Sequence, residues 1–356
     1  MPLMPGMSTA HYPPNVAITL FYRACLVVGV GVALVLVLLR YGFKAGAERS
    51  DDSRPKNPSW HTLTYLLGAL WLLDAVLQAQ PLMVTRFIGG MLQPLTGGQP
   101  AAVAALVHFG TTVWATNPIW YNVGACYIQG LIGVLLLFSR SRRTIRAALW
   151  ASAAWGAAIW IFGEGFGGVF AGGGPLQGAP GSVLFYVLGA WLLLKSDAWW
   201  TSGAWRRVVP LGFTVFFVLT AFLAAWPPSG WWTGAALYNW TSSMAGMPQP
   251  AILTSILRAW GDTLRAHPVP WNALIVASSV ALAAGWALHP EGRFLPWATF
   301  AWTFLIWCLG QDFGVMGGMG TDPNTGAVLL AFEVLWVSTL RVRWPAAGRV
   351  VVPERG

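Results

Sequence analysis

The chain has 356 residues, of which 56% are hydrophobic and only 9% are charged, and its mean hydropathy is +0.58. Soluble domains carry about 25% charged residues, so this composition excludes an ordinary water-soluble fold. The net charge of +9 could suit a nucleic-acid-binding protein, but the cations follow the loops between apolar segments, and we expect no nucleic-acid partner.

The apolar residues fall into separate runs of roughly 20, the length of a helix that crosses a ~30 Å hydrocarbon core. In chain order we predict nine spans, near residues 16–39, 60–80, 119–138, 145–162, 183–194, 208–225, 272–288, 295–309 and 327–340. Amphipathic stretches at 101–113 and 252–264 are expected to lie along the membrane interface. The predicted fold class is therefore all-α, a polytopic membrane helix bundle of about nine transmembrane helices in a lipid bilayer.

The cations are distributed unevenly between the two predicted sides of the membrane. No Lys or Arg precedes the first span, and alternation of the loops places 17 cations on one side but only Arg86, Arg258 and Arg265 on the other. Because cytoplasmic loops are enriched in Lys and Arg, we expect a plasma (inner) membrane protein with its N-terminus outside and its C-terminus in the cytoplasm.

An internal repeat is indicated at an offset of 147 residues. Residues 150–188 and 297–335 share 13 identities in 39 positions, including three spaced tryptophans and several glycines. The prediction is an N-terminal segment with the first span and a basic loop (1–57), two parallel four-helix units (58–205 and 206–345) and a cytoplasmic tail (346–356).

Polar residues gather in the outer half of the predicted spans, where each ionisable group carries an energetic cost. The candidates are Asp74, Gln78, Glu164, Gln311, Asp312, Glu333, Arg23 and Arg86. One interpretation is structural, with Asp74 or Glu164 neutralised by Arg23 or Arg86; the other is a pocket for a ligand, a quinone headgroup or an ion. The second unit has alanine at the positions matching Asp74 and Gln78, so we expect an asymmetric site.

A second pattern concerns methionine and histidine on predicted outer segments. The possible thioether and imidazole ligands are Met244, Met247, Met316, Met319, His108 and His267. Thioethers suit Cu(I), whereas flexible apolar packing in interfacial loops is the simpler interpretation.

The four-span unit, with a long outer segment after its first helix and Gly-rich turns such as residues 163–168 after its third, resembles the DoxX/DoxD-type membrane family. The resemblance would cover roughly residues 60–340, with the unit present twice. It implies a small quinone-linked or redox-associated membrane subunit with an extracytoplasmic oxidoreductase as partner, and it assigns no catalytic residue.

The leading hypothesis is thus a redox-associated membrane subunit with an outer-half polar site and quinone as the expected cofactor. The alternatives are a small-solute or ion transporter, an extracytoplasmic copper-handling protein and a structural scaffold. No nucleotide-binding, zinc-protease or hydrolase motif is present in the sequence, so whether the protein is an enzyme stays open.

Overall fold

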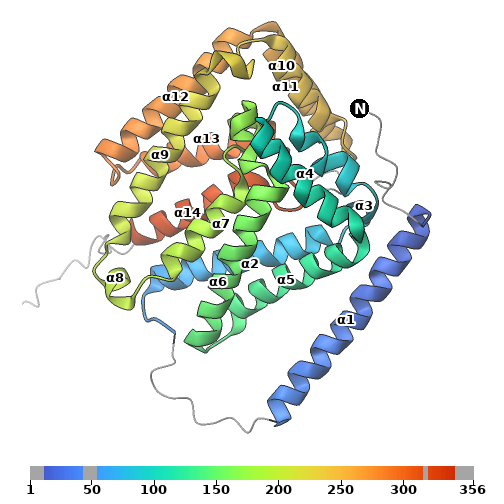
Figure 1. The fold of residues 1–356 in the computed structure, drawn as a ribbon. Coiled ribbons are helices and arrows are strands. Elements are labelled where there is room, and N and C mark those ends of the chain that lie inside the picture. The colour runs from blue at the N-terminus through green and yellow to red at the C-terminus, as the bar shows by residue number, and fades with distance from the viewer. Residues whose placement is uncertain (1–11, 43–53, 316–319, 341–356) are drawn as a thin grey trace, which may run out of the picture.

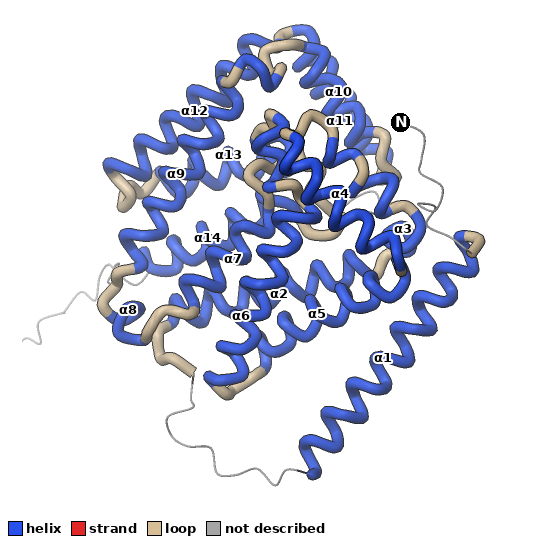
Figure 2. The backbone as a smooth tube through the Cα atoms, viewed as in Figure 1, coloured by secondary structure: helices blue, strands red, loops and turns tan. Residues whose placement is uncertain are grey.

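The computed structural model describes residues 12–42, 54–315 and 320–340, and every regular element in these ranges is a helix (Figures 1 and 2). The all-α class is therefore confirmed for the described part of the chain. The helices of the first half are α1 (Pro14–Gly42), α2 (Pro58–Gln78), α3 (Pro81–Thr85), α4 (Ala101–Thr116), α5 (Pro118–Phe138), α6 (Arg142–Ala158) and α7 (Ser182–Leu193). They are followed by α8 (Asp197–Thr201), α9 (Trp205–Ala225), α10 (Gly234–Ala245), α11 (Ala251–Ala266), α12 (Pro268–Leu288), α13 (Leu295–Leu309) and α14 (Asn324–Leu340).

Six stretches in the described residues are long and apolar enough to cross a membrane. They lie in α1, α2, α5, α9, α12 and the continuous helical segment formed by α6 and the π-helical turn η3 (Ile159–Gly163). The other three predicted spans are also helices, but α7, α13 and α14 have only 12, 15 and 17 residues. At 1.5 Å per residue, a helix of 12 residues covers about 18 Å, which is less than the ~30 Å hydrocarbon core. The structure therefore supports a membrane protein with six candidate spans.

Several helix boundaries follow from capping residues that are visible in the sequence. Asn57 accepts hydrogen bonds from the backbone N–H groups of Ser59 and Trp60, and Pro58 occupies the first turn of α2. Asn117 caps α5 in the same way, again followed by proline. Side-chain oxygens at these positions satisfy backbone donors that have no partner inside the helix.

The long helices form two antiparallel pairs, α2 with α5 and α9 with α12, and α6, α7, α13 and α14 lie between them (Figure 1). We call α2–α7 the first half and α9–α14 the second half. One apolar core crosses both halves and is built largely from tryptophan: Trp71, Trp200, Trp205 and Trp286 are each at most 2% exposed. α1 stands outside this core and contacts α3 and α5, with Phe21 buried against them and Leu26 68% exposed.

Loops predicted to lie on the cytoplasmic side meet at one end of the bundle. Arg142, at the start of α6, forms an ion pair with Asp197 of α8 at 2.7 Å. Asn57 donates to the carbonyl oxygen of Trp200 at 3.1 Å, and Arg54 donates to that of Ser139 at 2.7 Å. These contacts tie three loops that are distant in sequence into a single layer.

The predicted outer segments meet at the opposite end, where α3, α4, α10 and α11 lie (Figure 1). Both amphipathic stretches are helices, as expected, in α4 and α11. Tryptophan side chains connect this layer to the Gly-rich turns by hydrogen bonds. The indole N–H of Trp231 donates to the carbonyl oxygen of Gly172 at 3.0 Å, and that of Trp240 donates to the carbonyl oxygen of Gly310 at 2.8 Å.

Candidate functional site

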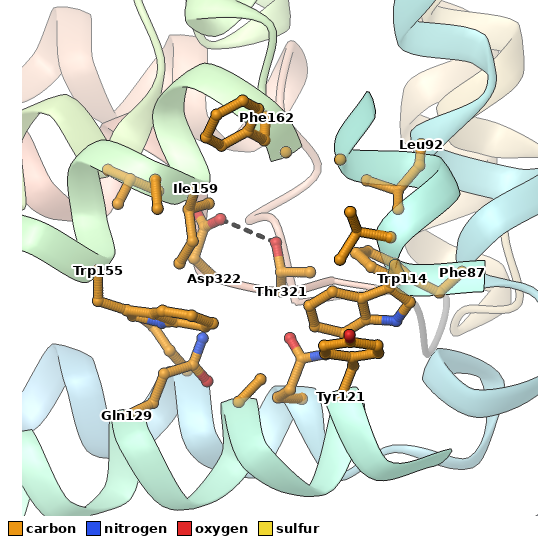
Figure 3. Close-up of a pocket in the computed structure, with 18 of the residues that line it drawn as sticks. Phe87, Leu92, Trp114, Tyr121, Gln129, Trp155, Ile159, Phe162, Thr321 and Asp322 are labelled. Atoms are coloured by element: carbon orange, nitrogen blue, oxygen red, sulfur yellow. Dashed lines mark hydrogen bonds between the residues drawn. The ribbon is translucent and has the colours of Figure 1, made fainter. Parts of the chain in front are cut away.

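A cavity lies in the first half, between α2, α4, α5, α6 and the turn η3 (Figure 3). Its volume is about 260 Å³. The loop before α14 forms one wall through Thr321 and Asp322, so the second half completes a cavity that otherwise belongs to the first.

The walls of the cavity are mainly aromatic. Trp114 stacks on Tyr121 with ring centroids 5.7 Å apart, and Phe87 meets Trp114 edge-on at 5.4 Å. Phe109 and Phe162 contact each other at 5.8 Å where α4 covers η3. Aromatic faces and edges of this kind favour an apolar or ring-bearing ligand over a hydrated ion.

Polar side chains from α2 and α5 line the floor of the cavity. Asp74 is 3% exposed and accepts a hydrogen bond from the Tyr186 hydroxyl at 3.1 Å. Gln78 donates to the side-chain oxygen of Asn122, which in turn donates to the Gln78 carbonyl oxygen at 3.1 Å. This exchange holds both amides in fixed orientations, one helical turn from Asp74, which also lines the cavity.

Three buried polar atoms in the cavity walls have no hydrogen-bond partner in the structure. They are Oε1 of Gln129 and the indole nitrogens of Trp114 and Trp155. Gln129 is only 3% exposed and points into the cavity opposite Asp322, with Trp155 beside it (Figure 3). Because buried polar groups are nearly always hydrogen-bonded, two unpartnered donors and one unpartnered acceptor on residues that line one cavity mark this part of the wall as a candidate for polar contacts with a ligand or bound water.

Two further carboxyl groups lie near Asp74: Asp322 in the cavity wall and Glu164 next to the cavity. Ser182, at the start of α7, donates to Oε1 of Glu164 at 2.9 Å. Asp322 accepts from the Thr321 hydroxyl at 3.0 Å and from the backbone N–H of Asn324 at 2.7 Å. Burial raises the pKa of Glu164 to about 8, and nearby Asp322 adds to the increase, while hydrogen bonds from Ser182 and from the backbone oppose it. Burial also raises the pKa of Asp322.

In comparisons with protein-family models, curated proteins and solved structures, none matched this chain.

Of the polar residues predicted from the sequence, Asp74 and Gln78 line the cavity and Glu164 lies next to it. Arg23 and Arg86 are exposed, and neither is among the hydrogen-bond or electrostatic partners of Asp74 or Glu164. The structure therefore does not show Arg23 or Arg86 neutralising Asp74 or Glu164.

The remaining polar candidates lie in the second half and do not reach the cavity. Gln311 donates to the carbonyl oxygen of Pro175 at 3.0 Å, and Glu333 accepts from the Thr303 hydroxyl at 3.0 Å. Burial raises the pKa of Asp312 to about 6, against a hydrogen bond from Gln249. These residues support the packing of α13 and α14.

The residues considered for copper are not assembled into a site in the described part of the chain. His108 and His267 are exposed, and Met244 and Met247 are partly buried near the end of α10. Met316 and Met319 lie outside the described residues. No group of three or more His, Cys, Asp or Glu suited to a metal ion occurs among the residues that the structure describes.

Sequence reasoning missed Asp322, Thr321 and the cavity tryptophans Trp114 and Trp155. For Asp322 a signal was present: Thr321-Asp322-Pro323-Asn324 is a turn-forming sequence directly before an apolar helix. For the tryptophans no signal was available, because 23 tryptophans are spread along the chain and most of them serve packing.

Proposed function

We propose that this membrane protein binds the headgroup of a lipid-soluble quinone or quinol in the aromatic cavity of its first half. The observation that carries the proposal is the set of buried, unpartnered polar atoms on Gln129, Trp114 and Trp155, three residues that line an otherwise aromatic cavity of about 260 Å³. Sites for drug-sized ligands span about 300–1,000 Å³, so this volume suits a headgroup whose tail remains outside.

The chemistry of the polar atoms matches both redox forms of such a ligand. A quinone has carbonyl oxygens that only accept, and the indole N–H groups of Trp114 and Trp155 donate. A quinol carries hydroxyl groups, one of which can donate to Oε1 of Gln129. The flat ring can stack on the cavity walls, where offset and edge-on aromatic contacts contribute about 0.5–1.5 kcal/mol each beyond area burial.

Access from the bilayer is supported by the outer surface of the same wall. Phe109 is 60% exposed and Tyr121 is 40% exposed, although both line the cavity. A lipid-soluble ligand could therefore enter between α4 and α5 without passing through water, which suits quinone better than a hydrophilic solute.

We also propose the finer topology: nine spans, an outer N-terminus and two parallel four-helix units of DoxX/DoxD type, with an extracytoplasmic oxidoreductase as partner. The gathering of the predicted cytoplasmic loops around the Arg142–Asp197 ion pair supports the orientation. Because α7, α13 and α14 are short, each would cross the membrane together with adjoining non-helical backbone. Irregular backbone at membrane depth is tolerated only where protein buries it. Residues 172–181, which precede α7, are mostly buried, as this requires.

The test is quinone binding by the purified full chain. Protein in detergent is incubated with a short-tailed benzoquinone or naphthoquinone and washed, and the retained quinone is measured by absorbance after solvent extraction. Ala125→Ile places a larger apolar side chain in the cavity wall and should reduce retention at least tenfold. The control Ala284→Ile makes the same change on an exposed face of α12 and should leave quinone retention unchanged.

Trp155→Phe separates a specific site from general partitioning, because it removes one N–H donor and retains an apolar ring. It should weaken retention severalfold. Retention that is unsaturable in the wild type and equal in all variants would overturn the proposal. Uptake of a small solute that depends on Asp74, with no quinone retained, would favour the transporter alternative.

A further inference from the structure

Three carboxyl groups from three distant segments converge on one face of α7. Asp74 comes from α2, Glu164 from the turn after η3, and Asp322 from the loop before α14. Ser182 and Tyr186 are four residues apart and therefore lie on the same face of α7. Between them, their hydroxyl groups contact all three carboxyl groups. The Ser182 hydroxyl bonds to Glu164 and also contacts Asp322, and the Tyr186 hydroxyl donates to Asp74 at 3.1 Å. We call Asp74, Glu164 and Asp322 the acidic cluster.

Among the residues that the structure describes, no cation acts on the acidic cluster. The charged and titratable groups that act on its members are the other members and Tyr186. On the elements packed around it, His108 of α4 is exposed and Glu333 of α14 is bonded to Thr303. The arginines of α6 lie at the opposite end of the bundle, where Arg142 meets Asp197.

Uncompensated carboxylates are costly in such a place. Two like charges that share a buried site raise the proton affinity of one of them, and burial acts in the same direction. Without a cation, the cluster lowers its energy by holding protons rather than by forming ion pairs.

The second half provides an internal comparison for Glu164. Gln311 occupies the position 147 residues later, and its side-chain oxygen accepts from the backbone N–H of Gly326 at 3.0 Å. Glu164 accepts from the backbone of Val183 in the equivalent way. A neutral amide thus performs the structural task in the second half, so the fold does not require an acid at this position.

A separate observation connects the cluster with a ligand. Asp74 and Asp322 both line the cavity, and so does Gln129, which is 3% exposed and whose Oε1 has no hydrogen-bond partner (Figure 3). Glu164 does not line the cavity and lies behind Ser182 in the Gly-rich turn of the end layer. The three acids therefore lead from the cavity floor toward the end of the bundle that α4 covers.

We propose that Asp74, Glu164 and Asp322 form a shared proton-binding site, which exchanges a proton with the cavity when a ligand binds there. The proposal rests on the ligand-binding function proposed above, and it names the group that such a ligand meets. No electron transfer is part of it: a proton leaves one oxygen of the cluster for an oxygen of the ligand, or moves in the reverse direction.

The first experiment uses the ligand-free full chain, so its outcome does not depend on quinone binding. Infrared difference spectra are recorded across neutral pH, following the carbonyl stretch of protonated carboxylic acids and its shift in D₂O. We expect such a band in the wild type and a clear loss of its intensity in Glu164→Gln and Asp322→Asn. The control Asp197→Asn should keep the full band, because the carboxylate that it removes is paired with Arg142. A band that none of Glu164→Gln, Asp322→Asn and Asp74→Asn reduces would overturn the proposal.

The second experiment tests the coupling to the ligand. Each proton exchanged on binding changes the dissociation constant by up to about tenfold per pH unit. The affinity for the short-tailed quinone should therefore vary with pH in the wild type and much less in Glu164→Gln. Equal pH dependence of the quinone affinity in both proteins would overturn the coupling. If the infrared spectra show the expected band and its loss in the variants but no quinone binds, only the proposed ligand is rejected. Glu164→Gln should remain folded, because Gln311 already fills the matching role, and its unfolding temperature is measured alongside.

Discussion

Trp160 and Trp307, which lie 147 positions apart, make the same two contacts in the two halves of the molecule. Each indole N–H donates to the carbonyl oxygen of a proline, Pro180 at 2.8 Å and Pro323 at 2.7 Å. Each ring also meets a phenylalanine edge-on with centroids 5.0 Å apart, at Phe166 and Phe313. These paired contacts support the predicted internal repeat at the level of individual side chains, although the repeat itself stays a prediction.

The Gly-rich turn behind Trp160 gives a first prediction. Gly167 has a φ of +64°, and a Cβ there would collide with the backbone of Pro180. Gly167→Ala should therefore destabilise the protein by at least about 2 kcal/mol, since the left-handed conformation alone costs an L-residue roughly 1–2 kcal/mol. Thermal unfolding in detergent measures the change. Gly124→Ala is the control, because its Cβ would have no neighbour within 4 Å, and a loss of equal size in both variants would contradict the argument.

A second prediction concerns a buried hydrogen bond between helices. The indole N–H of Trp71 donates to the Ser152 hydroxyl at 2.8 Å, and Trp71 is 1% exposed. Ser152→Ala leaves this donor without a partner, so stability should fall by about 1–2 kcal/mol. Ser278→Ala removes a hydroxyl that bonds only within its own helix, at a partly buried position. It should change the unfolding temperature little, and the opposite ranking of the two variants would refute the prediction.

Stability should also depend on pH through Glu164. Its pKa is about 8 in the folded protein against 4.5 for the free side chain. Because the folded state holds this proton more tightly than the unfolded state, the contribution is fully present below about pH 4.5 and is lost as the pH rises through about 8. The unfolding temperature of the wild type should therefore decrease over this interval, and that of Glu164→Gln should decrease less. Parallel pH profiles for the two proteins would exclude a contribution from Glu164.

The nine-span topology can be tested at α7, the shortest predicted span. Ala171 and Ala198 are exposed residues on either side of it. Cysteines placed there in a background without Cys25, Cys126 and Cys308 should react with a membrane-impermeant maleimide from opposite sides, Ala171→Cys from outside and Ala198→Cys only after permeabilisation. Reaction of both from the same side would show that α7 does not cross.

Some of the candidate site could be derived from the sequence, and some could not. Asp74 and Gln78 stood out because a buried polar residue in an apolar helix carries a cost that needs a reason, and both line the cavity. A pairing with Arg23 or Arg86 depends on distances between helices, which the sequence does not give, and neither arginine acts on Asp74 in the structure. Asp322 was overlooked because it lies in a loop more than 240 residues after Asp74, and no local pattern relates the two.

The sequence by itself determined the helical membrane class and the approximate helix positions, because hydrophobic runs and helix caps act over a few residues and can be identified without knowledge of the rest of the chain. It also indicated that α4 and α11 would be amphipathic helices between longer ones. Only the tertiary structure decided that a loop of the second half closes a cavity in the first. It also decided that three acids share one face of α7, with no cation among the described residues acting on them. Such groupings depend on how separate helices pack against one another, and that packing is set by shape and burial over the whole bundle rather than by any local run of residues.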